Sequence, residues 1–331
     1  MTVADAPRPA GRPLIVRLRH WVGDVILGVP ALRALEAAGW RLVLVGKPWA
    51  QALLAGEGWT VLTLPASAAQ RRQQLRALKS QLAAEDPGFK HRINLLLLSF
   101  SFGSALEARL AGLRAIGYRY EGRRWLLHRS LARVAGEHEL ESYWRIAAAL
   151  SGGADPPPRS IQLKVTDAAR TAASTRLAAA GIEGDFVMIC PFAGGTYSGQ
   201  DKRWPEFPAF AREAARVWQM PIVLCPGPGE ADGAHSEYPT STVIDKVPLD
   251  EYAALLERCR LMVSNDTGPG HLAAAVGAPL VSVLGPTEPG HWGAWGETVH
   301  LVRNADGWPA IDTVLAAAQT VMAPSREPAT T

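Results

Sequence analysis

Residues 261–287 constrain the fold more strongly than any other stretch of this chain. The apolar run 261–263 predicts a buried strand, residues 268–276 predict a helix, and residues 279–284 predict a second buried strand, which together form a βαβ unit. The turn and cap residues 264–268 fall where the first strand ends and the helix begins. Backbone N–H groups and the helix dipole favour a negatively charged ligand at that point, which is also the edge where α/β sheets bind ligands.

The polar residues at this helix start allow two interpretations. Asp266 or Thr267 could simply cap the helix, because both residue types are common N-caps. Capping does not require His271, which lies one helical turn after Thr267 and is expected to face the same way. The presence of the histidine therefore favours a binding site.

A second polar cluster follows the first predicted strand, residues 14–18. Gly23 allows close backbone approach, and Asp24 stands at the start of a predicted helix, residues 25–38, with its carboxylate at the sheet edge. Pro30 is expected to kink this helix or to begin a second one. The alternative role for Asp24 is again an N-cap. No G-x-G-x-x-G fingerprint is present, which argues against a dinucleotide site.

The third cluster follows a predicted strand at residues 186–190. Thr196, Ser198 and Lys202 are the residue types that hold phosphate oxygens, two hydroxyl donors and one compact cation. The segment does not match the P-loop pattern. The alternative is a flexible surface loop that ends in a solvated Lys202–Arg203 pair.

Taken together, these three clusters resemble glycosyltransferase family 9, the ADP-heptose:lipopolysaccharide heptosyltransferases. The similarity rests on Gly23-Asp24, on Lys202 followed by Trp204-Pro205, and on Asp266-Thr267-Gly268-x-x-His271, in that order over roughly residues 13–323. The resemblance implies an α/β protein of the GT-B type, in which two doubly wound parallel-sheet (Rossmann-like) domains face a cleft. The first domain would bind the acceptor and the second the nucleotide sugar.

The alternation of predicted strands and helices agrees with two such domains joined by a linker. Further strands are expected at residues 41–45, 60–64, 92–98 and 221–225, and further helices at 70–84, 139–150, 167–180, 206–218, 249–259 and 310–322. The Pro/Gly-rich residues 151–160 form the linker. The expected organisation is a polar tail (1–12), an acceptor domain (13–160), a nucleotide-sugar domain (161–309), a terminal helix that packs back on the first domain (310–323), and a second tail (324–331).

Composition narrows the functional classes without selecting one. The chain has 331 residues, of which 48% are hydrophobic and 20% charged, which fits two globular domains and excludes global disorder. The net charge of +3 suits anionic substrates, and the absence of a long basic run argues against nucleic-acid binding. The cysteines, Cys190, Cys225 and Cys259, are expected to be buried free thiols. The N-terminal residues lack an apolar signal-peptide core, so a cytoplasmic protein is expected.

The family resemblance implies that the chain transfers heptose from ADP-heptose to a hydroxyl of the lipopolysaccharide inner core, with inversion. Asp24 would be the general base, and Lys202 with the 266–268 helix start would stabilise the departing diphosphate. Thr196 and Ser198 would add hydrogen bonds to it. Asp266 would bind sugar hydroxyls, with the N–H groups of Thr267 and Gly268 and the side chain of His271 lining the same nucleotide-sugar site. Glu230 would bind the ribose.

No Asp-x-Asp pair occurs in the chain, so metal-independent transfer without a cofactor is expected. Other functions stay open: transfer to a protein or another surface glycan, use of a different sugar nucleotide, a sugar-nucleotide 2-epimerase on the same scaffold, or a binding module without catalysis.

A basic cluster near residues 119–129 also allows two interpretations. Arg119, Arg123 and Arg124 lie close to aromatic residues in the sequence. The default is an ordinary solvated face. The functional alternative is contact with acceptor phosphates or weak peripheral contact with the inner face of the cytoplasmic membrane, where the lipid acceptor is expected.

Overall fold

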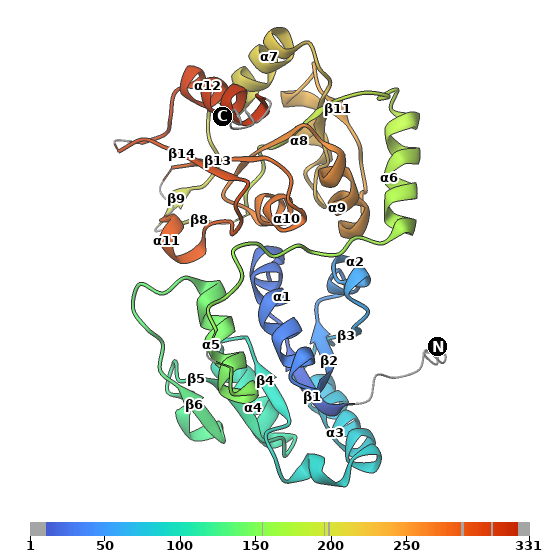
Figure 1. Ribbon diagram of the computed structural model, residues 1–331, viewed down its shortest axis with the longest axis vertical. Helices are drawn as coiled ribbons and strands as arrows, with labels where there is room; N and C mark the ends of the chain where they lie inside the picture. The colour runs from blue at the N-terminus through green and yellow to red at the C-terminus, as the bar shows by residue number, and fades with distance from the viewer. Residues whose placement is uncertain are drawn as a thin grey trace, which may run out of the picture. The chain divides into compact units, whose positions relative to one another are not determined.

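The computed structural model describes residues 11–153, 155–194, 196–197, 199–285, 288–305 and 307–323, and for residues 196–197 it describes the backbone alone. The chain divides into two compact units, unit 1 up to Pro158 and unit 2 from Arg159 (Figure 1). The sequence places this boundary two residues later, after residue 160. The predicted tails at residues 1–10 and 324–331 lie outside the described residues.

Unit 1 is built on a six-stranded sheet in the order β3-β2-β1-β4-β5-β6, and every strand pair in it is parallel. Its central strand β1 is buried from Pro13 to Arg17, as expected for a parallel strand covered on both faces. The strands are β1 (Arg12–Arg17), β2 (Trp40–Gly46), β3 (Thr60–Thr63), β4 (Leu95–Leu97), β5 (Ala115–Tyr118) and β6 (Arg129–Leu131).

The helices of unit 1 lie over the faces of this sheet, and α1 packs against α5 (Figure 1). The α-helices are α1 (Val22–Ala37), α2 (Ala50–Leu53), α3 (Ala68–Glu85), α4 (Phe102–Leu110) and α5 (Glu139–Ser151). The 3-10 helices are η1 (Ala55–Glu57), η2 (Pro87–Lys90) and η3 (Arg123–Leu126). The prediction of a second helix at Pro30 is wrong, because α1 runs through this buried proline as one helix.

Unit 2 repeats the same topology with the strand order β11-β10-β7-β12-β13-β14, again all parallel. Its strands are β7 (Val187–Cys190), β10 (Ile222–Leu224), β11 (Thr242–Val243), β12 (Leu261–Asn265), β13 (Leu280–Leu284) and β14 (Val299–Arg303), with a separate antiparallel hairpin of β8 (Thr196–Tyr197) and β9 (Gln200–Asp201). Its helices are α6 (Asp167–Ala179), α7 (Phe207–Trp218), α8 (Ala231–Glu237), α9 (Leu249–Arg258), α10 (Gly268–Val276), α11 (Pro289–Trp292) and α12 (Ile311–Met322).

The terminal helix α12 belongs to the core of unit 2. Its buried side chains Val314, Leu315 and Ala318 join the cluster that includes Trp204 and Phe210. That this helix also packs back on the first domain stays a prediction of the sequence. Its apolar stripe covers β13 and β14, the strands at one edge of the unit 2 sheet.

Both sheets have the strand order of a Rossmann-like fold, which confirms the predicted fold class. In this order the direction of winding reverses between β1 and β4 in unit 1, and between β7 and β12 in unit 2. Ligands of open α/β sheets bind at the carboxyl ends of the strands beside such a reversal. Asp24 follows β1, Lys202 follows β7, and Asp266 follows β12, so the three predicted clusters lie at these two edges.

Candidate functional site

Helix α10 in unit 2 begins directly after the polar residues for which the sequence predicts an anion-binding helix start. Thr267 is the N-cap residue, but its side chain makes no capping hydrogen bond to the helix. The Thr267 hydroxyl instead donates to the Asn265 carbonyl oxygen at 3.3 Å. The helix-cap interpretation is therefore wrong for Thr267, and the helix start keeps the positive partial charge that attracts an anion.

Three predicted residues of unit 2 meet at this helix start. The Lys202 Nζ lies 3.7 Å from Oδ2 of Asp266, and the His271 Nε2 lies 3.9 Å from Oδ1 of the same carboxylate. Asp266 and His271 are buried, whereas the side chain of Lys202 keeps a fifth of its surface exposed. The cluster thus presents a cation and an imidazole around one carboxylate beside the helix N-terminus.

Asn265, which the sequence analysis does not select, connects the strands that carry this cluster. Its side chain donates to the Pro191 carbonyl oxygen at 2.7 Å and accepts from the Trp204 backbone N–H at 2.9 Å. The Trp204 indole donates to the Pro309 carbonyl oxygen at 3.1 Å, and the ring is buried in the core of unit 2. Trp204 therefore anchors the segment that presents Lys202, which explains the Lys-x-Trp-Pro spacing.

Gly270 lets helix α10 approach β12 closely. A Cβ atom at this position would lie 2.6 Å from the Ser264 Oγ and 3.5 Å from the Asn265 carbonyl oxygen. A side chain at this position would therefore have to displace the Ser264 hydroxyl from the space between the strand end and the helix start, next to His271.

The structure gives less information about the other residues that are predicted to bind the nucleotide sugar. Glu230 is half-buried at the carboxyl end of β10, where its Oε2 accepts the Gly227 N–H at 2.7 Å. Thr196 is the first residue of strand β8, and Ser198 lies outside the described residues. The flexible-loop alternative does not describe Lys202, which faces Asp266, whereas the exposed Arg203 pairs with Asp201.

Asp24 occupies the corresponding edge of unit 1. Trp21 is the N-cap residue of α1 and Asp24 lies in the first turn, so the N-cap interpretation of Asp24 is wrong. The Arg19 Nε lies 3.2 Å from the Asp24 Oδ2, and the carboxylate is buried. Burial raises the pKa of Asp24 above its ordinary value of 3.8; Arg19 opposes this shift, and Glu139 adds to it.

Helix α5 supplies most of the surroundings of Asp24. Glu139 is buried and pairs with Arg133 at 2.8 Å, and Tyr143 is fully buried close to both carboxylates. Burial raises the pKa of Tyr143 well above 10, so it stays a neutral phenol. The guanidinium groups of Arg19 and Arg133 each lie 4.4 Å from the centre of the Phe100 ring. His138 is the N-cap residue of α5 and forms a capping box with Glu141.

The predicted acceptor or membrane contact of Arg123 is wrong. Its side chain is fully buried and donates to the carbonyl oxygens of Tyr118 at 2.7 Å and Ser99 at 2.6 Å. Burial lowers the pKa of this guanidinium to about 10, which leaves it charged at neutral pH. Arg119 and Arg124 are exposed, so the sequence cluster separates into one structural arginine and two surface arginines.

The three cysteines are free, and burial raises the pKa of the Cys190 and Cys259 thiols to about 12.

None of the helices within the described ranges has both the length and the hydrophobicity that a membrane span requires. No group of three or more His, Cys, Asp or Glu side chains that could hold a metal ion occurs in that part of the chain.

Two units with Rossmann-like sheets, one with a buried carboxylate at its edge and the other with a lysine beside a helix N-terminus, place the chain among α/β proteins of the GT-B fold. Comparison with known proteins identifies the family. The family model of glycosyltransferase family 9 (heptosyltransferase) matches residues 94–317, and the chain belongs to this family.

Individual relatives agree with this assignment. The chain is 24% identical to lipooligosaccharide heptosyltransferase 2 of Haemophilus ducreyi over 320 residues, which cover 87% of each protein. It is 37% identical to lipopolysaccharide heptosyltransferase 1 of Pseudomonas aeruginosa over 108 residues, which span 30% of either chain. Among solved structures, the E. coli ADP-heptose lipopolysaccharide heptosyltransferase II superposes with a TM-score of 0.74 at 20% identity, covering 94% of this chain and 98% of that one. This superposition shows that the two proteins have the same fold.

Proposed function

We propose that this protein transfers heptose from ADP-heptose to a hydroxyl of the lipopolysaccharide inner core, with inversion at the anomeric carbon. The observation that carries the proposal is the meeting of Lys202, Asp266 and His271 at the uncapped N-terminus of α10. The names of its relatives, lipopolysaccharide and lipooligosaccharide heptosyltransferases, support heptose as the transferred sugar and this glycan as the acceptor, and the structurally similar E. coli enzyme is named for ADP-heptose.

Unit 2 would bind the donor and stabilise its leaving group. The Lys202 ammonium and the first N–H groups of α10 face the diphosphate, where negative charge grows as the bond to the sugar breaks. The Asp266 carboxylate, beside these donors, accepts hydrogen bonds from sugar hydroxyls. Glu230 has one carboxylate oxygen committed to Gly227 and offers the other to the ribose.

Unit 1 would activate the acceptor. The Asp24 carboxylate takes the proton of the acceptor hydroxyl while the hydroxyl oxygen forms its bond to the anomeric carbon, and ADP departs with the electron pair of the broken bond. Burial that raises the pKa of Asp24 makes it a stronger base than a solvated aspartate. Arg19, at 3.2 Å, fixes the orientation of the carboxylate and limits this shift.

Two measurements test the proposal against its alternatives. ADP-heptose, but not UDP-N-acetylglucosamine, should raise the melting temperature, because a ligand that binds only the folded state stabilises it by mass action. Incubation with ADP-heptose and a lipopolysaccharide core precursor should yield ADP and a heptosylated glycan. Release of free nucleotide or an altered sugar without any acceptor would favour a 2-epimerase, and donor binding without turnover would favour a binding module.

We further propose that unit 1 contacts the inner face of the cytoplasmic membrane through one surface, defined here as the α4 face. It comprises the α4 stripe Phe102, Leu106 and Leu110 and the neighbouring η3 residues Arg124 and Trp125. The stripe residues are 43%, 37% and 45% exposed, and Trp125 is 84% exposed with the Arg124 guanidinium 5.2 Å from its ring. Apolar side chains beside arginine suit an anionic lipid interface.

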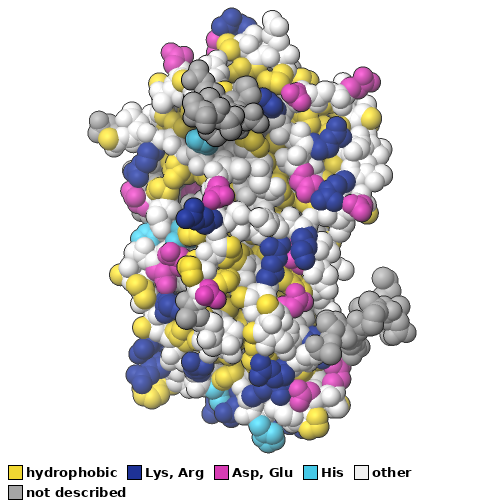
Figure 2. Space-filling model, in the orientation of Figure 1, with side chains coloured by type: hydrophobic (Ala, Val, Ile, Leu, Met, Phe, Trp, Pro, Cys, Tyr) yellow, Lys and Arg dark blue, Asp and Glu magenta, His cyan; other side chains and the backbone are white. Residues whose placement is uncertain are grey.

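Vesicle sedimentation tests the α4 face. Binding to vesicles that contain anionic phosphatidylglycerol should exceed binding to phosphatidylcholine vesicles, and salt should weaken it because exposed charges are screened. Leu106→Ser and Arg124→Ser should each reduce binding. Val217→Ser in unit 2 is the matched control, because Val217 is also 37% exposed on a helix. Equal sedimentation of the control and the α4-face variants would rule this surface out. On the face drawn in Figure 2, basic side chains are spread over both units and mixed with acidic ones.

A further inference from the structure

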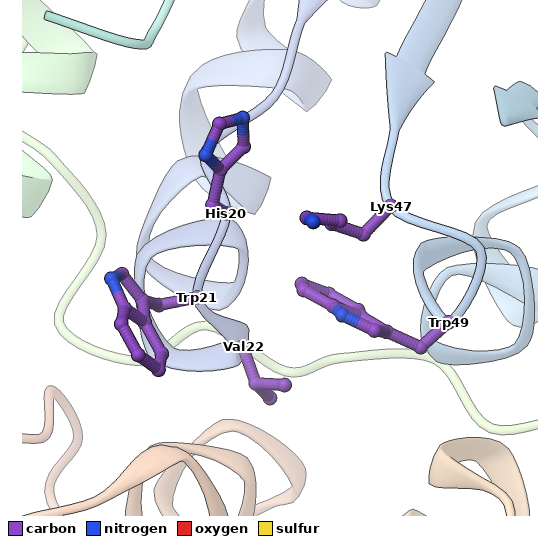
Figure 3. Close-up of a pocket in the computed structure, with 5 residues that line it drawn as sticks. All are labelled: His20, Trp21, Val22, Lys47 and Trp49. Atoms are coloured by element: carbon purple, nitrogen blue, oxygen red, sulfur yellow. The ribbon is translucent and has the colours of Figure 1, made fainter. Parts of the chain in front are cut away.

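The acidic and phenolic neighbours of Asp24 both come from helix α5. Glu139 and Tyr143 are four positions apart on this helix, so their side chains lie on one face of it, and α5 packs against α1. The pocket beside the start of α1 offers no such groups, since none of its lining side chains is acidic or phenolic. It is lined by His20, Trp21, Val22, Lys47 and Trp49 (Figure 3).

Glu139 and Tyr143 are buried, and each keeps a polar atom without an aligned partner. The Tyr143 side chain is 0% exposed and Glu139 is 1% exposed. Glu139 uses its Oε2 for the ion pair with Arg133 at 2.8 Å. Within the described residues, neither its Oε1 nor the Tyr143 hydroxyl makes a well-aligned hydrogen bond. A buried polar group is destabilising unless it is hydrogen-bonded, so this acceptor and this donor call for a partner close by.

The Tyr143 phenol is within reach of two carboxylates. Burial raises the pKa of Asp24, and a hydrogen bond from the Tyr143 phenol is one of the contacts that oppose the shift. Burial also raises the pKa of Tyr143, and both the charge of Asp24 and a hydrogen bond donated to Glu139 add to that shift. A phenol has a single proton, so it can donate to only one of these carboxylates at a time.

Each carboxylate has an arginine of its own, whereas the two share the phenol. Arg19 lies 3.2 Å from Asp24, and Arg133 lies 2.8 Å from Glu139. Both guanidinium groups also lie 4.4 Å from the centre of the Phe100 ring. The arginines hold the carboxylates in place, but the O–H bond of the phenol can rotate between them.

We propose that Tyr143 is a positioning residue whose phenol donates to Asp24 while that carboxylate is ionised and turns to Glu139 when Asp24 takes the acceptor proton. In the first state the hydrogen bond orients the Asp24 carboxylate beside Arg19. In the second state Asp24 is neutral, and the charged Glu139 is the stronger acceptor. Tyr143 keeps its own proton throughout, because the transferred proton passes from the acceptor hydroxyl to Asp24. The inference rests on the proposed role of Asp24 as the base.

NMR at neutral pH tests the shared phenol without any turnover. The full chain, labelled with ¹³C at the tyrosine Cζ, gives one signal for each of its six tyrosines, and Tyr143→Phe assigns the Tyr143 signal. Asp24→Asn imitates the protonated base. Asp24→Asn and Glu139→Gln should each leave the Tyr143 signal close to its wild-type position, because the other carboxylate accepts the phenol. The double variant should shift the signal upfield, because no charged acceptor is left.

The Tyr118 signal is the internal control in these spectra. The Tyr118 hydroxyl donates to the Ser142 carbonyl oxygen of α5 at 2.6 Å, so its signal should stay unchanged in all three variants. An upfield shift of the Tyr143 signal in Asp24→Asn alone would show that the phenol does not reach Glu139. The same shift in Glu139→Gln alone would show that it does not reach Asp24. Either result, or an unshifted signal in the double variant, would overturn the proposal.

The acid limb of the pH profile for heptose transfer provides the second arm. Tyr143→Phe removes a donor from the ionised carboxylate and should move this limb to higher pH by about one unit, the size that one hydrogen bond to a charged group produces. Tyr252→Phe, which removes a buried phenol from unit 2, should leave the limb in place. A limb that does not move in Tyr143→Phe would overturn the positioning role.

The shared phenol and the proposed function can fail separately. The expected NMR pattern in a protein that transfers no heptose would support the shared phenol and overturn the proposed function. Heptose transfer by a protein in which one single substitution already shifts the Tyr143 signal would overturn the shared phenol and leave the function intact.

Discussion

The two sheet edges each carry a buried aspartate in the same local setting, but the two carboxylates have different neighbours. Asp24 and Asp266 both lie near the point where a parallel strand has ended and the next helix begins, and both are buried. Asp24 faces Arg19 and lies close to the acidic Glu139, and burial raises its pKa. Asp266 faces Lys202 and His271 beside a helix N-terminus. If the proposed roles hold, the groups that neighbouring elements bring to the edge, and not the aspartate itself, distinguish the proton acceptor from the binding residue.

The two edges also differ in how they are held together. In unit 2 the neutral amide of Asn265 ties the ends of β7 and β12 to the segment that carries Lys202. In unit 1 the charged Arg123 does the equivalent work, because it bonds to Ser99 after β4 and to Tyr118 at the end of β5. Arg123 thereby fixes the segment that presents Phe100 to Arg19. A buried charge is costly unless hydrogen bonds compensate it, so this edge depends strongly on the bonds that one side chain makes.

The comparison is tested most directly by removing the proposed base. Asp24→Asn should lower kcat for heptose transfer by about 10²–10⁴, the usual loss for a general base, while the dissociation constant of ADP-heptose stays nearly unchanged. Single-turnover kinetics and donor titration by calorimetry separate the two quantities. Asp250→Asn, which neutralises a first-turn acid of α9 in unit 2, is the control for helix-terminus effects. An active Asp24→Asn enzyme would place Asp24 outside the mechanism.

Substitution of two adjacent arginines should change the stability of unit 1 by very different amounts. Arg123→Ser should lower the free energy of unfolding of unit 1 by about 3 kcal/mol or more, because several hydrogen bonds to a buried charged group are lost and carbonyl oxygens are left unsatisfied. Arg124→Ser should stay within about 0.5 kcal/mol, as expected for an exposed side chain. Denaturant unfolding followed by circular dichroism measures both. Equal stability of the two variants would contradict the role assigned to Arg123.

Loss of the lysine in unit 2 should affect the donor. Lys202→Ala should weaken use of ADP-heptose by about 10–100-fold, which corresponds to one charged hydrogen bond, and leave KM for the acceptor nearly unchanged. Arg212→Ala, an exposed cation on α7, is the control. If Lys202 and the α10 N-terminus hold the diphosphate, transfer should also persist in excess EDTA. Loss of activity with chelator and recovery with Mg²⁺ would assign that task to a metal ion.

The smallest expected effect is the pH dependence of the unit 1 edge. Asp24 acts as a base only when it is ionised, so kcat/KM should fall as the pH drops through its folded-state pKa, which burial raises above 3.8. The decline is at most about tenfold per pH unit. Glu139→Gln removes a negative neighbour and should move the inflection of the profile to lower pH. A profile that does not shift in this variant would argue that Glu139 does not influence the ionisation of Asp24.

Local sequence patterns were sufficient for the fold class and for the three clusters. The run 261–284 reads as strand, helix and strand because periodicity and turn chemistry are local properties, and the structure has β12, α10 and β13 there. Among the strands and α-helices, the sequence missed α2, α4, α8, α11, β5, β6, β8, β9, β11 and β14. The edge strand β6 is three residues long and reads Arg-Ser-Leu. Such short edge strands carry too few apolar residues for a periodic signal.

The order of most strands and helices, and the residue types at the strand ends, can be predicted from the local sequence. Which of these residues meet depends on the tertiary structure. Arg123 and Arg124 are adjacent and chemically identical, yet Arg123 is buried and Arg124 is exposed at the surface. Glu139 reaches the surroundings of Asp24 because α5 packs on α1, and Lys47 reaches His20 because β2 pairs with β1. Strand order and helix packing join segments far apart in the chain, and no local pattern encodes those distances.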